Sequence, residues 1–182
     1  MMSGRRAILC ILSILLVAAY ASPKTARAYD KRFADWATVS HPRHGFQIAY
    51  PGNVFAPAAG PASDDGQVFI SRDGSAKLIV AAFANDQAIG LLDYRTQLLS
   101  ENYEGTHIDY GPQHRTWFIV SGTRGDMHFY ERVSFTCEGR MINSWALLYP
   151  AAQREFYDRA VEAIARTYSP GAGQAGQCGG VQ

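Results

Sequence analysis

Hydrophobic and polar residues alternate with a period of two in residues 45–50, which is the pattern of a half-buried β-strand, and further apolar runs typical of strands recur up to residue 149. Clusters of glycine, proline and acidic residues separate these runs and predict where the strands end. Asp73-Gly74 separates two apolar runs and predicts a tight hairpin, because glycine adopts the positive φ that such a turn requires. The expected strands cover residues 45–50, 67–71, 76–83, 106–110, 116–121, 127–137 and 140–149.

Two segments have the helical period instead. In residues 87–102 apolar side chains recur at intervals of three and four, and Asn85-Asp86 is placed to cap the helix start. A second helix is expected after Pro150. The first stripe is Ile89, Leu92, Thr96, Leu99 and Tyr103, and the second is Tyr157, Val161, Ile164 and Tyr168. An antiparallel β-sheet with two main helices packed against it belongs to the α+β class.

Two further segments lack either period. Residues 29–44 form a polar lead-in that bears a few aromatic residues, and residues 53–65 are interrupted by prolines. Proline removes a backbone donor and fixes φ, so the second segment is expected to be a surface loop.

The first 28 residues predict a secretory signal peptide. Arg5 and Arg6 begin the chain, residues 7–21 are apolar, and Ala26-Arg27-Ala28 places small residues before a cleavage point at Ala28–Tyr29. The alternative is an uncleaved membrane anchor, but the apolar stretch is shorter than the about 20 residues that span a bilayer. We therefore expect a periplasmic or secreted protein with no stable membrane anchor after cleavage.

Removal of the signal peptide changes the charge balance. Four of the 17 basic residues lie in it, so 13 remain against 16 acidic residues and the formal charge becomes −3. A nucleic-acid-binding protein would instead carry a basic face interleaved with aromatic residues. The sequence predicts no nucleic-acid partner, and it contains no cofactor-binding motif.

Cleavage also decides the cysteine chemistry. Cys10 is removed, which leaves Cys137 at the end of a predicted strand and Cys178 in the glycine-rich residues 169–182. An even pair in an oxidising compartment favours a structural disulfide that pins this tail to the sheet. Two free thiols or a redox-active pair are the alternatives, although the chain has no Cys-x-x-Cys motif.

Four local patterns resemble those of the PsbP-like superfamily. They are Gly45-Phe46-x-Ile48-x-Tyr50-Pro51, the span from Asp65-Gly66 to Asp73-Gly74, Trp117-Phe118-Ile119-Val120-Ser121-Gly122 followed by Phe129-Tyr130-Glu131-Arg132, and Leu148-Tyr149-Pro150 before the last helix. The superfamily includes extrinsic photosystem II subunits, small Ran-binding proteins and many exported bacterial proteins. The resemblance implies a PsbP-like domain over residues 45–168 and a binding or assembly role rather than catalysis.

Several histidines and acidic residues are candidate metal ligands. His107 and Asp109 alternate onto one side of a predicted strand, and His128 lies on another strand, so the three would meet if those strands are neighbours. Solvated surface histidines are the alternative. No dense ligand motif of the zinc type is present.

Glu131 stands out because it shares its strand face with Phe129, Val133 and other apolar residues. A buried carboxylate is costly unless it is paired or hydrogen-bonded. One interpretation is a structural ion pair with Arg95 or Arg124. The other is an acid with a raised pKa in a ligand-binding cleft.

The sequence therefore favours a non-enzymatic binding or accessory protein for a protein partner or a cell-envelope component. Aromatic residues suit such a surface, and the candidates for ligand or partner binding are Glu131, Tyr130, Trp145 and Tyr110. The alternative is a small-molecule or metal-binding module that uses a cleft near Glu131 and His107. A hydrolase-type enzyme comes third, because neither Ser75 nor Ser121 lies in a Gly-x-Ser-x-Gly motif.

Overall fold

The structure is a computed structural model that describes residues 30–59, 63–174 and 178. The predicted signal peptide and its cleavage point lie outside these residues. Within the described ranges, no helix combines the length and apolarity needed to cross a membrane.

A seven-stranded antiparallel sheet forms the centre of the molecule, in the order β3-β4-β5-β9-β8-β7-β6. The expected meander is confirmed, because β6, β7, β8 and β9 are neighbours in chain order. The strands of this sheet are β3 (Phe55–Pro57), β4 (Gly66–Ser71), β5 (Lys77–Ala84), β6 (His107–Tyr110), β7 (Trp117–Arg124), β8 (Met127–Thr136) and β9 (Met141–Pro150). The α+β fold class that the sequence predicts is thus observed.

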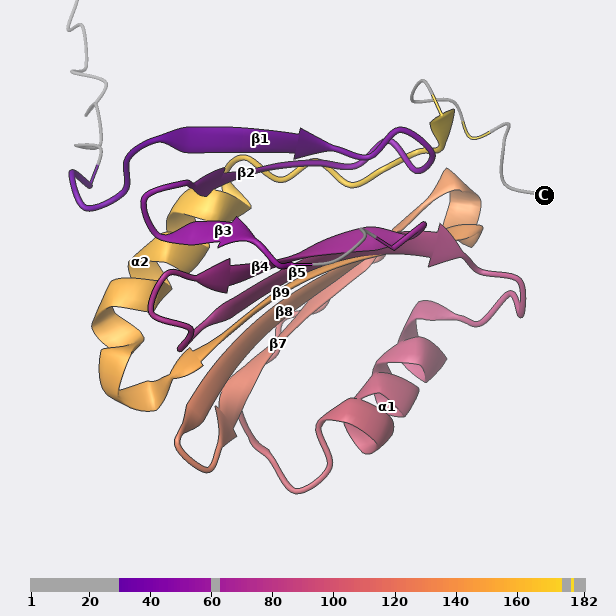
Figure 1. Ribbon diagram of the computed structural model, residues 1–182. Helices are drawn as coiled ribbons and strands as arrows, with labels where there is room; N and C mark the ends of the chain where they lie inside the picture. The colour runs from indigo at the N-terminus through magenta and orange to yellow at the C-terminus, as the bar shows by residue number, and fades with distance from the viewer. Residues whose placement is uncertain (1–29, 60–62, 175–177, 179–182) are drawn as a thin grey trace, which may run out of the picture.

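The remaining elements form a layer on each side of this sheet (Figure 1). A two-stranded hairpin and α2 cover one face, and α1 covers part of the other. These elements are β1 (Trp36–Ser40), β2 (Gln47–Pro51), α1 (Leu91–Asn102) and α2 (Arg154–Ala165), with short 3₁₀ turns η1 (Cys137–Gly139) and η2 (Ala151–Gln153).

The larger core lies between the sheet and the layer of α2, β1 and β2. Trp145 and Tyr149 of β9 and Phe46 before β2 are almost completely buried in it. The predicted stripe of α2 is confirmed for Tyr157, Val161 and Ile164, which all face this core. Tyr168 packs against the same core from just beyond the helix.

The core beneath α1 is smaller, and the stripe predicted for this helix is partly wrong. Leu98 is its one fully buried residue within the described range, whereas Leu92 is 61% exposed and Thr96 lies at the surface. The helix begins at Leu91 rather than at residue 87, because the Asn85 side chain bonds both the N–H and the carbonyl of Ile89 and thereby holds a turn before the helix. Three members of the predicted stripe, Ile89, Leu99 and Tyr103, do pack against this core, and they do so together with Leu91, Tyr94 and Leu98.

Two segments expected to be irregular contain strands. Trp36–Ser40 in the lead-in pairs with β2 over five residues, and Phe55–Pro57 in the expected loop pairs with β4. Each of these segments pairs with the next strand along the chain, and this pairing, rather than its own hydrophobic pattern, gives it strand structure. The predicted Asp73-Gly74 turn is present, with φ of 75° at Gly74 and the Asp73 carboxylate accepting the Ser75 N–H at 3.0 Å.

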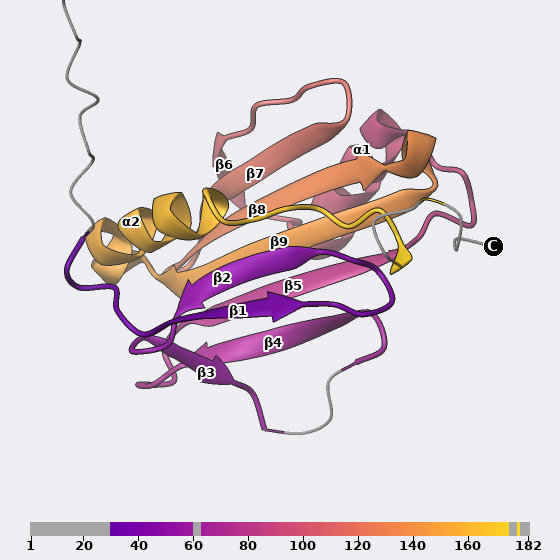
Figure 2. The same cartoon turned by 90° about the horizontal axis from the view of Figure 1, so that it is seen from above.

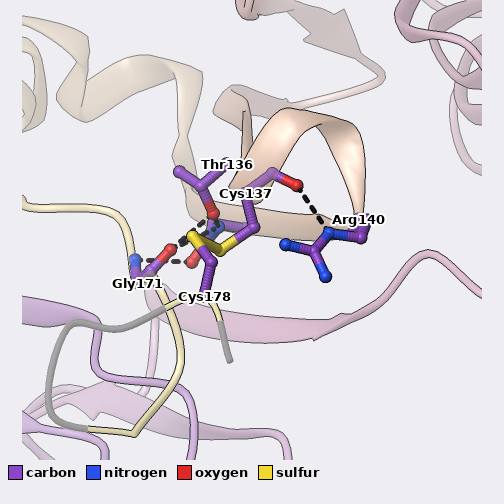
Figure 3. Close-up of a disulfide and its surroundings, with 6 residues drawn as sticks. Thr136, Cys137, Arg140, Gly171 and Cys178 are labelled. Carbon is purple, nitrogen blue, oxygen red and sulfur yellow. Dashed lines mark hydrogen bonds between the residues drawn. A yellow bond between two sulfur atoms is a disulfide. The ribbon is translucent and has the colours of Figure 1, made fainter. Parts of the chain in front are cut away.

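Cys137 and Cys178 form the expected disulfide, with Cα atoms 5.2 Å apart (Figure 3). The chain after α2 is also held before it reaches Cys178. The carbonyl of Gly171 accepts hydrogen bonds from Thr136 and Asn143, and its N–H donates to Asn143 at 2.7 Å. A disulfide between these cysteines points to an oxidising compartment.

Candidate functional site

Strand alternation places neighbouring residues of β8 on opposite faces of the sheet. Tyr130 and Arg132 face the α2 side, whereas Glu131 faces the α1 side. The strand register shows which residues of the neighbouring strands lie beside them on the same face. Arg132 lies opposite Ile119 of β7 and Trp145 of β9, and Tyr130 lies opposite Ser121, which in turn lies opposite Tyr110 of β6.

The α2 side of β6, β7 and the adjoining part of β8 lies outside the area that α2 and the β1–β2 hairpin cover (Figure 2). Aromatic residues and one arginine gather there, and we call this surface the outer aromatic face. Tyr110 is 56% exposed, and the other members are partly buried. The outer aromatic face consists of Tyr110, Trp117, Tyr130, Arg132 and Tyr168.

Arg132 is the central cation of this face. Its guanidinium carbon lies 4.7 Å from the centroid of the Trp117 ring, a cation–π contact. It forms no ion pair with any residue in the described ranges. Its Nε atom is buried and has no hydrogen-bond partner among them. A half-buried guanidinium is therefore left without an anion.

Three other buried polar atoms near Arg132 also lack a partner within the described part of the chain. They are Nε1 of Trp145, the hydroxyl of Tyr168 and Oγ of Ser134. Trp145 lies opposite Arg132 in the register, and its ring centroid is 6.1 Å from that of Tyr168. Ser134 lies two residues from Arg132 on the same strand. Buried polar groups in native proteins are nearly always satisfied, so such a group requires an explanation.

Burial raises the pKa values of two tyrosines of this face. It raises the pKa of Tyr130 to about 12 and that of Tyr168 further, while the charge of Arg132 opposes both shifts. Both phenols are therefore neutral and able to donate hydrogen bonds at any physiological pH. The ring of Tyr130 packs 5.0 Å from that of Trp145, which places it beside the unpartnered atoms.

Glu131, on the opposite face, is buried and fully hydrogen-bonded. The hydroxyls of Tyr103 and Ser144 donate to its two carboxylate oxygens, each at 2.5 Å. Burial raises the pKa of Glu131, and these two hydrogen bonds oppose the shift. The expected ion pair with Arg95 or Arg124 is wrong: among the described residues, hydroxyl groups take the place of a cation.

The predicted cleft near Glu131 and His107 requires a correction for the same geometric reason. His107 lies opposite Thr123, which lies opposite His128, and this row faces the α2 side. Glu131 faces α1. The sheet separates the two side chains, so they do not line one cleft.

The candidate metal ligands meet only in part. His107 Nε2 lies 3.2 Å from Asp109 Oδ1, and the other oxygen of Asp109 is 3.7 Å from Arg154. His128 lies two strands away and is only 1% exposed. Within the described ranges, no group of three or more histidine, cysteine, aspartate or glutamate side chains is arranged to hold a metal ion.

His128 makes a contact that the sequence analysis missed. Its Nε2 lies 3.2 Å from Oγ of Ser121 and its Nδ1 lies 3.2 Å from Oγ1 of Thr123. A serine nucleophile would need an accessible hydroxyl and a base oriented by a third group, usually a carboxylate. Ser121 is only 7% exposed, and burial and nearby Arg154 lower the pKa of His128. The cluster is therefore a buried link between β7 and β8.

Two solved structures resemble this one over most of the chain. Cyanobacterial PsbP (CyanoP) from Synechocystis sp. PCC 6803 has a TM-score of 0.54 and 12% sequence identity, covering 80% of this chain and 98% of its own. The Saccharomyces cerevisiae Ran-binding protein Mog1p has a TM-score of 0.53 and 11% identity, covering 75% and 96%. The chain has the PsbP/Mog1 fold. No family model and no curated protein matches its sequence.

On this PsbP/Mog1 fold, three of the four residues predicted to bind a ligand or partner share one face. Tyr110 and Tyr130 belong to the outer aromatic face, and Trp145 is buried on the same side of the sheet, opposite Arg132 in the register. Glu131 lies on the far side of the sheet. Arg132 was missed as a candidate. Its strand parity with Tyr130 was the signal that would have found it.

Proposed function

We propose that this is an exported accessory protein that binds a protein partner through the outer aromatic face. The observation that carries the proposal is the incomplete cover of the α2 side of the sheet. α2 and the β1–β2 hairpin cover part of that side, and β6 and β7 extend beyond them (Figure 2). Tyr110 of β6 is 56% exposed, and Trp117 of β7 and Arg132 of β8 are partly buried.

The composition of the outer aromatic face supports a protein partner. Tyrosine, tryptophan and arginine are the residue types that contribute most to binding energy in protein interfaces. They combine a large apolar contact area with polar groups that fix orientation. The yeast relative in fold is itself described as a Ran-binding protein.

The chemistry of the two ends of the chain supports export. Residues 1–28 have the three parts of a secretory signal. The disulfide joins Cys137 to Cys178, the two cysteines that would remain after cleavage. A structural disulfide persists in an oxidising compartment and is rare in the cytosol.

Site-specific photocross-linking tests the proposed surface. A photoreactive phenylalanine analogue is placed at Tyr110 in one variant and at Leu92 in another. These two positions are closely matched, with 56% and 61% of the residue exposed, and they lie on opposite sides of the sheet. Illumination of cells that naturally produce the protein is followed by mass spectrometry of the adducts.

We expect a discrete protein adduct from position 110 and none from position 92. An adduct from position 92 alone would move the partner to the α1 side and contradict the proposal. No adduct from either position would also count against a stable protein partner. The same mass spectra test export, because the mature chain is expected to begin at Tyr29.

A further inference from the structure

We propose that a cavity at the start of α1 binds a small carboxylate that carries an apolar body. The cavity has a volume of about 610 Å³, which is within the range of small-molecule sites. Residues from 85–91, 115–116 and 135–140 line it, so it lies between the turn before α1, the chain that enters β7, and η1. It is on the α1 side of the sheet and is therefore separate from the outer aromatic face.

One part of the lining is apolar. Phe135 of β8 is only 9% exposed, and Ile89 and Leu91 pack against the same core beneath α1. All three side chains line the cavity. An apolar group that enters the cavity is removed from water against these side chains, and this burial favours binding.

Two arginines supply positive charge to the same cavity. Arg115 and Arg140 both line it, and both are exposed, so a ligand can reach them from solvent. Neither forms an ion pair with any residue in the described ranges. Nε of Arg140 donates to the carbonyl of Cys137 at 3.1 Å, which holds this side chain beside η1 (Figure 3).

The charge of the lining selects a carboxylate over a phosphate. Glu138 is its third charged residue, and two arginines with one glutamate give a formal charge of +1. A single negative charge balances this value. A phosphate dianion would keep an uncompensated charge beside the apolar residues, which is costly away from water. Arginine also matches the planar geometry of a carboxylate and forms strong hydrogen bonds to it.

Hydrogen bonds within the protein hold the walls of the cavity in place. Nδ2 of Asn85 donates to the carbonyls of Ile89 at 3.0 Å and Gly139 at 2.7 Å, and so joins the turn before α1 to η1. The N–H of Asn85 donates to the Arg140 carbonyl at 2.8 Å. The disulfide at Cys137 anchors η1 as well. A site that is formed in advance loses less conformational entropy when a ligand binds.

The backbone adopts a costly conformation on two sides of the cavity. Ala88 and Glu138 line it with φ of 50° and 59°, and Cys137, next to Glu138, has φ of 55°. This left-handed region disfavours residues other than glycine. Residues held in it cluster at ligand-binding sites, so their position here supports a binding role.

NMR titration of the mature, disulfide-bonded protein with small probes tests this site. Phenylacetate carries one carboxylate and an apolar ring, and phenylacetamide is its neutral isostere. Acetate keeps the charge without the ring, and phenyl phosphate replaces the carboxylate by a dianion. The reporters are the backbone amide signals of Gly90 and Gly139, which both line the cavity.

We expect phenylacetate to shift both signals in a saturable manner, with a dissociation constant of about 1 mM, as suits a ligand of this size. Phenylacetamide and acetate should each bind at least about 10-fold more weakly, because one lacks the charge and the other lacks the apolar ring. Equal binding of either one, tighter binding of phenyl phosphate, or no saturable shift with any probe would each overturn the inference.

Three variants assign binding to the cavity. Arg115→Gln removes one exposed guanidinium and should weaken phenylacetate binding by about 10-fold. Thr116→Trp starts from an exposed residue of the lining and places a large side chain in the cavity, so it should abolish binding. Arg166→Gln removes an exposed arginine outside the lining and is the matched control, which should bind as the unmodified protein does. Unchanged binding in Thr116→Trp, or equal losses in Arg115→Gln and Arg166→Gln, would place the ligand elsewhere and contradict the assignment.

Discussion

Glu131 and Arg132 are adjacent in sequence, yet they lie in opposite environments on the two faces of one strand. The carboxylate of Glu131 is enclosed beneath α1, and two hydroxyls satisfy its oxygens. The guanidinium of Arg132 lies over Trp117 with no anion, and its buried Nε lacks a partner in the described ranges.

This difference separates a structural polar group from a binding group. A buried group whose hydrogen bonds are all made within the fold contributes to stability and has nothing left for a ligand. A partly open group whose hydrogen bonds are not made lowers stability and retains its capacity to bind. Burial alone would point to Glu131 as the binding group, whereas the lack of hydrogen-bond partners points to Arg132.

The largest expected effect is on the free energy of unfolding, when the side chains of Glu131 and Arg132 are removed one at a time. Glu131→Ala should lower the free energy of unfolding by about 3 kcal/mol, because it leaves a cavity and two buried hydroxyls without an acceptor. Arg132→Ala should cost less than about 1 kcal/mol, mainly the cation–π contact with Trp117. Urea unfolding of the disulfide-bonded variants measures both. Similar costs for the two would mean that Arg132 is also a structural residue.

A smaller effect is expected from two matched tyrosine variants. Tyr103→Phe removes a hydroxyl that donates to Glu131 and should cost about 1–2 kcal/mol. Tyr168→Phe removes a hydroxyl without a partner in the described ranges, so its cost should lie within about 0.5 kcal/mol of zero. Thermal unfolding of the two variants compares them directly. A clear loss of stability in Tyr168→Phe would show that its hydroxyl is already used within the protein.

The spacing of hydrophobic residues along the sequence was sufficient to predict the main strands, the meander and α2, because these elements have regular apolar faces. It did not predict β1 or β3, because their strand structure comes from pairing with β2 and β4 rather than from their own hydrophobic alternation. The stripe of α1 was predicted only in part: Ile89, Leu99 and Tyr103 pack on the sheet, whereas Leu92 and Thr96 are exposed. The periodicity of this helix is weak, because Leu98 is the one residue of α1 that is buried.

The candidate site was predicted incompletely for a related reason. Strand parity correctly placed Glu131 on an apolar face, but an ion pair with arginine was expected, and the actual donors are Tyr103 and Ser144. Ser144 is 13 residues away and Tyr103 is 28 away, so both contacts depend on the packing of separate elements. The unpartnered state of Arg132 likewise follows from what α2 fails to cover, which no local pattern encodes.

The smallest expected effect is a pH dependence that isolates Glu131. Its folded-state pKa lies above its usual value of 4.5, mainly because of burial, so the folded protein binds this proton more tightly than the unfolded chain does. The resulting stability is fully present below pH 4.5 and is lost as the pH rises through the folded-state pKa. Glu131→Gln cannot ionise, so its stability relative to that of the unmodified protein should rise across this window.

Urea unfolding from about pH 4 to about pH 8 measures that difference. Asp30 and Asp73, each with a pKa of about 2, titrate below the window. Burial lowers the pKa values of His41 and His128. Because both proteins contain these histidines, the effect of their titration on stability cancels in the difference. Glu104→Gln, at an exposed position, is the control for the loss of a surface carboxylate. A flat difference for Glu131→Gln would mean that the hydroxyls of Tyr103 and Ser144 fully offset the cost of burying the charge. Glu131 would then be as well satisfied when ionised as when neutral, and its contrast with the unpaired charge of Arg132 would be sharper still.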